Sequence, residues 1–164
     1  MQQKKTFGQE VVLPCIEESY DDEEYFKALG EASNINAQNA RTGAFDAAKS
    51  MLLRRLGGLI QGVSEDYSRS VSGQSQQDKI QRLIETDMNT IVVKCINDAQ
   101  KTCEKIFQDD AGNYNSFITI KVSKKEMINK ITKSLSQNEE LNIEFNREEF
   151  RKYAEDRIKN FKQE

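Results

Sequence analysis

The strongest constraint on the fold is one stripe of apolar side chains that recurs at helical spacing from Ala37 to Tyr67. Either Asn34 or Asn36 can cap the start of this helix, because a short polar side chain accepts hydrogen bonds from the free amides of a first turn. The stripe comprises Ala37, Ala40, Ala44, Ala47, Met51, Leu56, Leu59, Ile60, Val63 and Tyr67. Its first half is lined by alanines, so we expect another backbone to approach the helix closely there.

Four glycines lie inside this helical pattern, namely Gly43, Gly57, Gly58 and Gly62. Each costs about 1 kcal/mol relative to alanine in a helix. They predict either tight packing against the helix or a bend near its middle. The last three do not form a phosphate-binding loop, since no Lys-Ser or Lys-Thr pair follows them and no strand precedes them.

A second amphipathic helix is predicted over residues 76–96, after a polar break at residues 70–77 that contains Gly73. Its buried side comprises Ile80, Leu83, Ile84, Met88, Ile91, Val92 and Cys95. Two long adjacent helices joined by a short loop form an antiparallel hairpin.

The pattern then changes to that of a β-hairpin. Residues 102–108 and 114–122 flank the turn-rich segment 109–113, Asp-Asp-Ala-Gly-Asn. One face of the second strand carries Ser116, Ile118, Ile120 and Val122. The helical hairpin is the apolar partner available to cover that face. Because an isolated β-hairpin is only marginally stable, we expect residues 25–32 to join it as a third strand.

The chain before this third strand is mostly polar. Residues 1–9 are predicted to be a flexible segment, and residues 11–13 a short edge strand that stops at Pro14, which cannot donate a ladder hydrogen bond. The acidic run at residues 17–24 is predicted to be a solvated loop, since its spacing matches no calcium-binding loop.

Two capping boxes mark helices near the end of the chain, Ser123 with Glu126 and Asn146 with Glu149. Between these helices, the alternation over residues 141–145 predicts a short strand. The last helix places Phe150, Tyr153, Ala154, Ile158 and Phe161 on one side.

Together these patterns predict an α+β fold. A long antiparallel helical hairpin packs on a small antiparallel sheet, and one or two further C-terminal helices complete it. The chain shows no internal repeat and no low-complexity linker, so a single domain is predicted over residues 10–164.

The sequence contains no histidine, which removes the commonest general base, the usual serine and cysteine triads and most transition-metal sites. The 27 acidic residues lie mainly in solvated runs or at helix caps, where structural roles explain them. The net charge of −3, with Lys and Arg spread along the chain, argues against nucleic-acid binding, which needs a clustered basic face. We therefore expect a protein that is not an enzyme and has no cofactor, no metal site and no nucleic-acid partner.

Three cysteines, Cys15, Cys95 and Cys103, leave two interpretations open. Cys95 lies on the apolar side of its helix, so it is expected in the core, and a disulfide would then join Cys15 to Cys103. That link would close a loop of roughly 90 residues and stabilise the fold by about 4 kcal/mol in the chain-entropy model. The alternative is three reduced cysteines that behave as small hydrophobic side chains.

The order of the motifs, rather than any catalytic signature, carries a family resemblance. The segments are Pro14-Cys15, the acidic run, Glu24-Tyr25-Phe26-Lys27-Ala28-Leu29-Gly30, Asn39-Ala40-Arg41, Thr102-Cys103-Glu104-Lys105, Gly112-Asn113-Tyr114, Ile118-Thr119-Ile120-Lys121-Val122, Leu135-Ser136, Glu139-Glu140-Leu141 and Glu149-Phe150-Arg151-Lys152. Over most of residues 11–155 the chain resembles the LPP-twenty-like family of bacterial outer-membrane or periplasmic lipoproteins.

The resemblance implies export by a signal peptide, lipid attachment at an N-terminal cysteine, a small sheet packed against long helices, and no enzymatic activity. A similar helix-and-sheet module in a flagellar ring protein favours an assembly role by analogy of fold. The chain departs from the family pattern because it begins Met1-Gln-Gln-Lys-Lys, without the cysteine that would carry the lipid. Met1 is therefore interpreted as an initiator that replaces a removed segment; a native Met1 would put the envelope assignment in doubt.

The leading functional prediction is a structural or protein-interaction module in the periplasm or at the outer membrane. It would have a protein partner in the cell envelope and would contact the membrane only through a removed lipid anchor. The main alternative is a small-ligand carrier or sensor that holds its ligand between sheet and helices. An unorthodox enzyme and a cytosolic helical adaptor are the remaining hypotheses.

Overall fold

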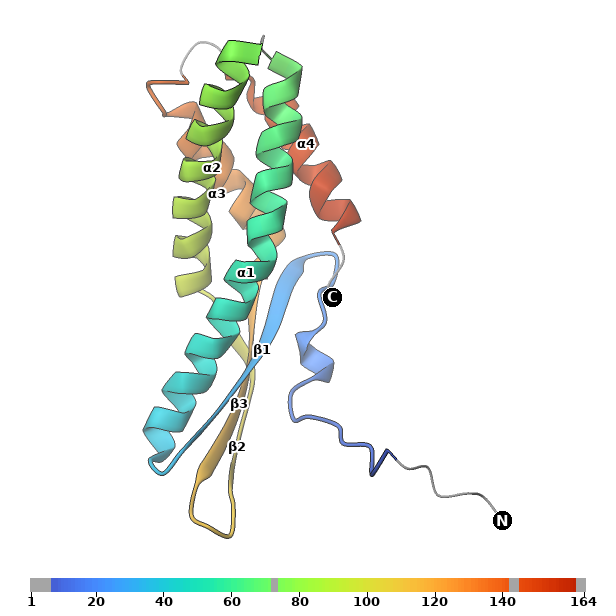
Figure 1. Cartoon of the computed structure of the whole chain (residues 1–164), viewed down its shortest axis with the longest axis vertical. Coiled ribbons are helices and arrows are strands. Elements are labelled where there is room, and N and C mark those ends of the chain that lie inside the picture. Colours follow the sequence, from blue (N-terminus) through green and yellow to red (C-terminus); the bar gives the residue numbers. More distant parts are fainter. Residues whose placement is uncertain (1–6, 72–73, 142–144, 162–164) are drawn as a thin grey trace, which may run out of the picture.

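The computed structural model describes residues 7–71, 74–141 and 145–161. It is an α+β fold, as predicted, in which helices cover one face of a three-stranded antiparallel sheet (Figure 1). The elements are the 3-10 helix η1 (Glu17–Ser19), β1 (Tyr25–Asn34), α1 (Ala37–Val71), α2 (Gln74–Asn97), β2 (Gln100–Gln108), β3 (Tyr114–Ser123), α3 (Lys124–Ser136) and α4 (Arg147–Asn160). The first half of α1 lies along the sheet, and its second half packs among α2, α3 and α4 at the other end of the molecule.

Helix α1 begins where its caps predict. The side chain of Asn36 accepts a hydrogen bond from the amide of Asn39 at 3.0 Å, and Asn34 accepts one from the amide of Asn36 at 2.9 Å. The predicted stripe is wrong at Ala47 and Met51, because Met51 is 43% exposed and Ala47 only half-buried. Every fourth residue from Ala40 through Ala44, Ala48 and Leu52 to Leu56 is buried instead, the spacing at which residues stack on one helix face.

The alanine half of α1 admits the close backbone approach that was predicted. A Cβ atom placed at Gly30 of β1 would overlap the carbonyl oxygen of Ala44 and the amide nitrogen of Ala48. Inside the helix, Gly43 and Gly62 are also closely packed, against Ala32 and Arg157. Gly57 and Gly58 face open space, and no contact explains them.

The strand order is β1-β3-β2, and both neighbours run antiparallel to the central β3. The predicted inward face of β3 is confirmed, since Ser116, Ile118, Ile120 and Val122 are all buried. The pairing of β2 with β3 shifts between Lys101 and Cys103, which marks a bulge near the start of β2. Strand β1 extends two residues beyond the predicted segment, to Asn34.

Both predicted capping boxes form their cap. Ser123 accepts a hydrogen bond from the amide of Glu126 at 3.2 Å, and Asn146 accepts one from Glu149 at 3.1 Å. The last helix packs on the core through Phe150, which is fully buried. The first residues of α3 and α4 are thereby fixed relative to the sheet and to α1.

Several N-terminal and loop predictions differ from the structure or lie outside it. Residues 11–13 form no strand: Val11 is 76% exposed, and the chain turns at Pro14 before it can align with a neighbouring strand. The acidic run is only partly a solvated loop. Residues 17–19 form η1, and Asp21 and Asp22 accept hydrogen bonds from backbone amides of β1. The turn at Gly73, the centre of the predicted strand 141–145 and most of the predicted flexible segment 1–9 lie outside the described residues.

Candidate functional site

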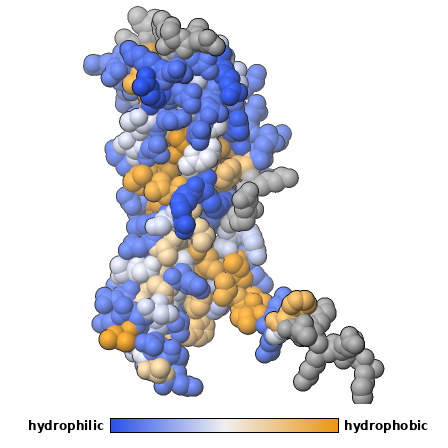
Figure 2. Space-filling view, viewed as in Figure 1, coloured by the Kyte–Doolittle hydropathy of each residue, from blue (hydrophilic) through white to orange (hydrophobic). Residues whose placement is uncertain are grey.

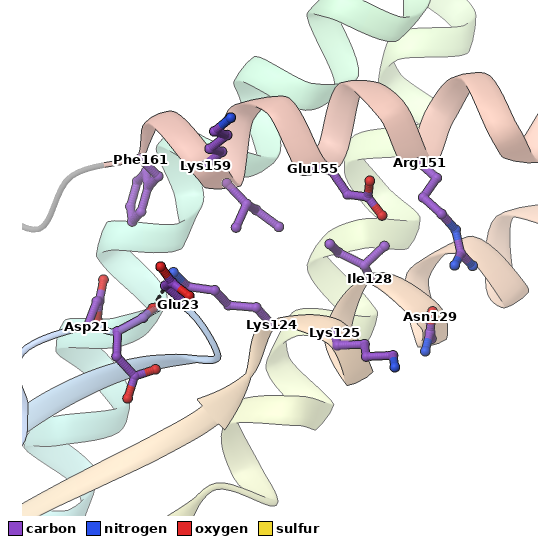
Figure 3. A pocket seen from close by; sticks show the side chains of 12 residues that line it. Asp21, Glu23, Lys124, Lys125, Ile128, Asn129, Arg151, Glu155, Lys159 and Phe161 are labelled. Carbon is purple, nitrogen blue, oxygen red and sulfur yellow. Dashed lines mark hydrogen bonds between the residues drawn. The ribbon is translucent and has the colours of Figure 1, made fainter.

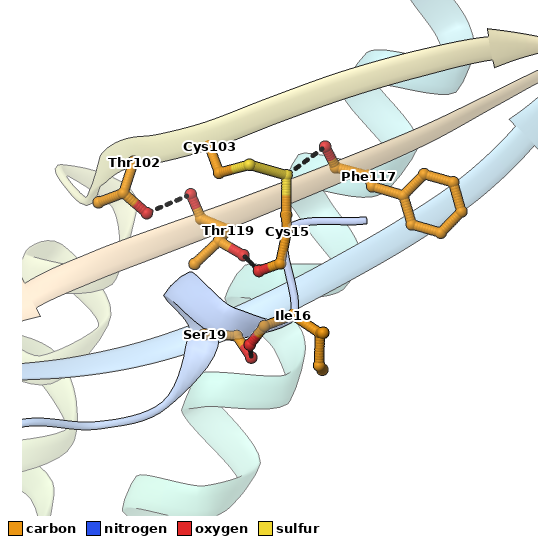
Figure 4. Close-up of a disulfide and its surroundings, with 7 residues drawn as sticks. All are labelled: Cys15, Ile16, Ser19, Thr102, Cys103, Phe117 and Thr119. Carbon is orange, nitrogen blue, oxygen red and sulfur yellow. Dashed lines mark hydrogen bonds between the residues drawn. A yellow bond between two sulfur atoms is a disulfide. The ribbon is translucent and has the colours of Figure 1, made fainter. Parts of the chain in front are cut away.

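Residues 7–24 are here called the strap, which meets the sheet at Cys15, on the face that points away from α1. The predicted disulfide is present: Cys15 is joined to Cys103 across a sequence separation of 88, with 5.7 Å between their Cα atoms (Figure 4). Thr119 of β3 lies beneath this link, and its hydroxyl donates to the carbonyl oxygen of Cys15 at 2.9 Å. Thr119 is fully buried although it points away from the helices. The strap is therefore the cover of this part of the sheet.

The backbone at Cys15 is bent sharply. Its φ of 66° lies in the left-handed region, which is uncommon for residues other than glycine. Pro14 precedes it, and the amide of Ile16 returns to the carbonyl oxygen of Leu13 at 3.3 Å. This turn brings the Cys15 side chain onto the sheet and leads the chain into η1. Such a conformation costs on the order of 1–3 kcal/mol and persists where the surroundings hold it.

A second tie joins the end of the strap to β1 and α1. The carboxylate of Asp21 accepts from the amide of Lys27 at 2.7 Å and forms an ion pair with Arg55 of α1. Arg55 also donates to the carbonyl oxygen of Lys27 at 2.7 Å. Asp22 accepts from the amide of Tyr25 at 2.7 Å and pairs with Lys27 at 2.9 Å. The hydrogen bond from Lys27, followed by those from the backbone, lowers the pKa of Asp22 below its ordinary value.

An apolar groove, here called the strap groove, opens between the strap, β1 and α1. It has a volume of about 460 Å³, within the range of about 300–1,000 Å³ that ligand sites occupy. The side chains that make it apolar are Leu13, Ile16, Tyr20, Leu29, Ala47 and Met51. Tyr20 is 60% exposed and Met51 is 43% exposed. Figure 2 shows the apolar surface that gathers where the strap meets the sheet.

A second groove, here called the α3–α4 groove, has a volume of about 770 Å³ and is lined mainly by charged groups (Figure 3). Its floor is apolar, with Ile128, Ile158 and Phe161. The lining groups are Asp21, Asp22 and Glu23 of the strap, Lys124, Lys125 and Asn129 of α3, and Arg151, Glu155 and Lys159 of α4. Within the described parts of the chain, Lys125, Arg151 and Glu155 form no ion pair.

The void among the buried faces of α1 to α4 is too small for a ligand. The void lined by Leu56, Met88 and Phe150 has a volume of about 20 Å³, which holds about one water molecule. A pocket between the sheet and the helices α2 and α3, lined in part by Tyr25, Cys95 and Lys121, has a volume of about 160 Å³, below the range of about 300–1,000 Å³ that ligand sites occupy. A carrier or sensor role is therefore better served by one of the two surface grooves.

The third cysteine behaves as predicted. Cys95 is a buried free thiol at the end of α2, and its burial is the main cause that raises its pKa. A thiol with a raised pKa is largely protonated at neutral pH and is a poor nucleophile. Three or more His, Cys, Asp or Glu side chains that could hold a metal ion do not converge anywhere in residues 7–71, 74–141 and 145–161. None of the helices in these segments has the length and apolar character that crossing a membrane requires.

Reasoning from the sequence identified the covalent tie of the strap but missed the groove beside it. Ala47 and Met51 were assigned to the core stripe, whereas they line the strap groove. Apolar residues recur at every fourth position from Ala40 to Leu56 and so mark the buried face of the helix. Ala47 and Met51 each come one residue before a member of this series, which places them beside the buried face. Neither a family model, nor a curated protein, nor a solved structure matches this chain.

Proposed function

We propose that this protein is an exported, non-enzymatic interaction module of a bacterial cell envelope, of the kind found in LPP-twenty-like lipoproteins. The observation that carries the proposal is the link between Cys15 and Cys103. Disulfides persist in oxidising compartments such as the periplasm and are rare in the bacterial cytosol. The link is the covalent tie between the strap and β2, so its loss in a reducing compartment would loosen the part of the strap before η1.

The position of the strap supports a tethered module. Its first described residue, Phe7, is 92% exposed, and the chain reaches the sheet only at Cys15. A lipid anchor upstream of the strap would hold the sheet end of the molecule toward the membrane, and the anchor would be the only membrane contact. The strap groove then faces neighbouring envelope proteins rather than the core of the protein.

The charged pairs have structural duties, which supports a role in binding rather than in catalysis. Asp21 and Arg55 fasten the strap to α1, and Asp66 with Arg157 fastens α4 to α1. Asp66 accepts two hydrogen bonds from Arg157, at 2.6 and 3.0 Å. The hydrogen bond from Arg157 lowers the pKa of Asp66 further below neutral, whereas a general acid or base needs a pKa close to the working pH.

The first experiment measures the redox state and location of the protein in bacterial cells that express the native gene. Cells are quenched in acid, thiols are alkylated with a maleimide that adds mass, and soluble and envelope fractions are compared. We expect Cys15 and Cys103 to resist alkylation in the envelope fraction until a reductant is added. Cys95 should react only after unfolding, which provides an internal control. Alkylation of Cys15 and Cys103 without reduction, or recovery in the cytosolic fraction, would overturn the proposal.

The second experiment tests for a protein partner at the strap groove. A photo-crosslinking amino acid replaces Met51, which lines the groove, and in a matched control it replaces Asn89, which is exposed on α2. We expect a discrete crosslinked protein from position 51 in intact cells and none from position 89. Equal products from both positions would show that the groove has no special role.

A second candidate function, a small-ligand carrier or sensor, is favoured by the α3–α4 groove alone. The uncommitted charges of Lys125 and Arg151 above an apolar floor suit a short amphipathic carboxylate. Decanoate titrated against the purified protein should then raise the unfolding temperature, and Arg151→Ala should abolish that rise. Arg147→Ala, at the exposed start of the same helix, serves as the control. If the decanoate effect is the same in both variants, this candidate fails.

A further inference from the structure

Strand β1 is an edge strand, and one stretch of its outer edge is open. The edge is closed at Lys27, whose amide donates to Asp21 and whose carbonyl oxygen accepts from Arg55, each at 2.7 Å. In an antiparallel ladder, the backbone groups of every second residue point to the same side. The amides and carbonyls of Leu29 and Glu31 therefore also point outward, away from β3. No described residue donates to them or accepts from them.

The open stretch of edge lies in the wall of the strap groove. Leu29, Gly30 and Glu31 all line that groove. A strand that paired with this edge would place side chains alternately toward Met51 on α1 and toward Ile16 on the strap. Both surfaces are apolar, so the middle of such a strand would be apolar on both faces.

The groove lies in the most acidic part of the chain. Residues 7–31 contain eight carboxylates and one cation, Lys27. Glu17 and Glu18 are exposed on η1, and Glu31 lies at the groove itself. Of the described residues that line the groove, only Arg54 is cationic. An occupant with cations on both sides of its apolar centre would complement this field, and an acidic one would be repelled.

We propose that the Leu29–Glu31 edge in the strap groove binds an extended segment of a partner protein, with a short apolar centre flanked by Lys or Arg, which adds a fourth strand to the sheet. Backbone hydrogen bonds to an open edge supply affinity in this mode of recognition, and the neighbouring pockets supply specificity. The proposal rests on the interaction role proposed above, since it names the chemistry of the partner.

The opposite edge of the sheet is a weaker candidate. The bulge between Lys101 and Cys103 twists the start of β2, and Lys101 and Lys105 add charge to that strand. Bulges and edge lysines are devices by which proteins discourage strand addition. The outer edge of β1 is blocked at Tyr25, by Asp22, and at Lys27, where Asp21 and Arg55 end the available edge.

The test uses the purified, disulfide-linked chain and a fluorescent peptide, Lys-Lys-Val-Ile-Val-Lys-Lys, followed by fluorescence anisotropy. Two matched peptides serve as controls, one with Glu in place of every Lys and one with N-methyl groups on its three central residues. We expect the first peptide to bind and both controls to bind at least tenfold more weakly. N-methylation removes the backbone donors that strand pairing needs and leaves the charge unchanged, and since it adds apolar surface, weaker binding cannot come from a loss of apolar contact.

Two variants of α1 distinguish peptide binding in the strap groove from non-specific binding to other apolar surfaces. Met51→Ser should weaken binding about tenfold, the factor expected for one buried apolar side chain. Leu53→Ser is the control, since Leu53 is 37% exposed on the same helix and does not line the groove. Hydrogen exchange should show new protection at the amides of Leu29 and Glu31 on peptide binding, and none at Lys27, which is already bonded.

Each contrary outcome overturns the proposal in a different way. Equal binding of the Glu peptide removes the charge argument, and equal binding of the N-methyl peptide removes strand addition. Protection on β2 moves the site to the other edge. If the protein self-associates and Met51→Ser abolishes this, the occupant of the groove is a second copy of the chain. If the protein binds phosphatidylglycerol vesicles through the groove, the occupant is a membrane surface. If the photo-crosslinker at position 51 captures a protein in cells but the purified protein binds none of the peptides, this inference fails and the proposed function stands. If the cysteines are reduced in cells while the peptide binds, the proposed function fails and the groove chemistry stands.

Discussion

The hydroxyl of Tyr67 accepts a hydrogen bond from the backbone amide of Asn146 at 2.8 Å. Tyr67 lies near the end of α1 and is 1% exposed, while Asn146 caps α4. The Tyr67 ring also packs on Phe145 and Phe150, with centroid distances of 5.5 and 5.6 Å. One side chain of α1 therefore fixes both the position and the first residue of α4.

Removal of this hydroxyl should cost stability without changing the packing. In Tyr67→Phe the ring remains, but the amide of Asn146 loses its partner, so we expect the free energy of unfolding to fall by about 1 kcal/mol. Urea unfolding followed by circular dichroism measures this change. Tyr153→Phe, on a half-buried tyrosine of α4, serves as the control and should change little. Equal losses in the two variants would mean that the hydroxyl has no special role.

Two glycine-to-alanine substitutions should have opposite effects. Gly30→Ala places a methyl group against the backbone of α1 at Ala44 and Ala48, which cannot rotate away, so we expect a loss of about 3 kcal/mol or more, or failure to fold. Gly57→Ala places the same group in open space within a helix and should stabilise the protein by about 0.5–1 kcal/mol. Thermal and urea unfolding of both variants check the pair, and a neutral Gly30→Ala would contradict the close approach.

Reduction of the disulfide should release the strap before the rest of the protein unfolds. The link closes a separation of 88 residues, which corresponds to about 4 kcal/mol in the chain-entropy model. A protease that cleaves after glutamate should then cut at Glu10, Glu17 or Glu18 much faster in the presence of a reductant. Cleavage at Glu148, at the exposed start of α4, should change less. Unchanged cleavage of the strap would mean that its other ties suffice to hold it.

The ion pair between Asp66 and Arg157 should make stability fall at acidic pH. The hydrogen bond from Arg157 holds the pKa of Asp66 below its ordinary value of 3.8. A depressed folded-state pKa contributes stability above the ordinary value and loses it as the pH falls through the folded value. Because the pair is partly exposed, the contribution is at most about 1 kcal/mol. Asp66→Asn should lower stability at neutral pH and flatten its decline between about pH 5 and pH 2, as measured by urea unfolding.

The sequence predicted the elements whose signals are local. The helix α1, apart from the positions of Ala47 and Met51 in its stripe, the caps at Asn36, Ser123 and Asn146 and the pairing of Cys15 with Cys103 are confirmed. Each of these depends on residues a few positions apart or on a short elimination among three cysteines. Local rules therefore suffice for the order of the elements and for one covalent link.

The candidate site depends on contacts that no local rule contains. The strap groove exists because Asp21 meets Arg55 across 34 positions and because the turn at Cys15 lays the strap on the sheet. The exposure of Met51 could be predicted from the spacing of apolar residues along α1, but the position of the strap beside it could not. The open edge at Leu29 follows from the pairing of β1 with β3 alone, which is a property of the assembled sheet.

The link between Cys15 and Cys103 also determines how the molecule would carry mechanical load. Tension applied at the N-terminus reaches the covalent network at Cys15 and passes directly into β2, so the intervening segment of β1, α1 and α2 is bypassed. Those elements lie in a closed loop that pulling from the chain ends cannot extend while the bond is intact. Under force applied at the two ends, only the segments outside the loop, which include β3, α3 and α4, could lengthen.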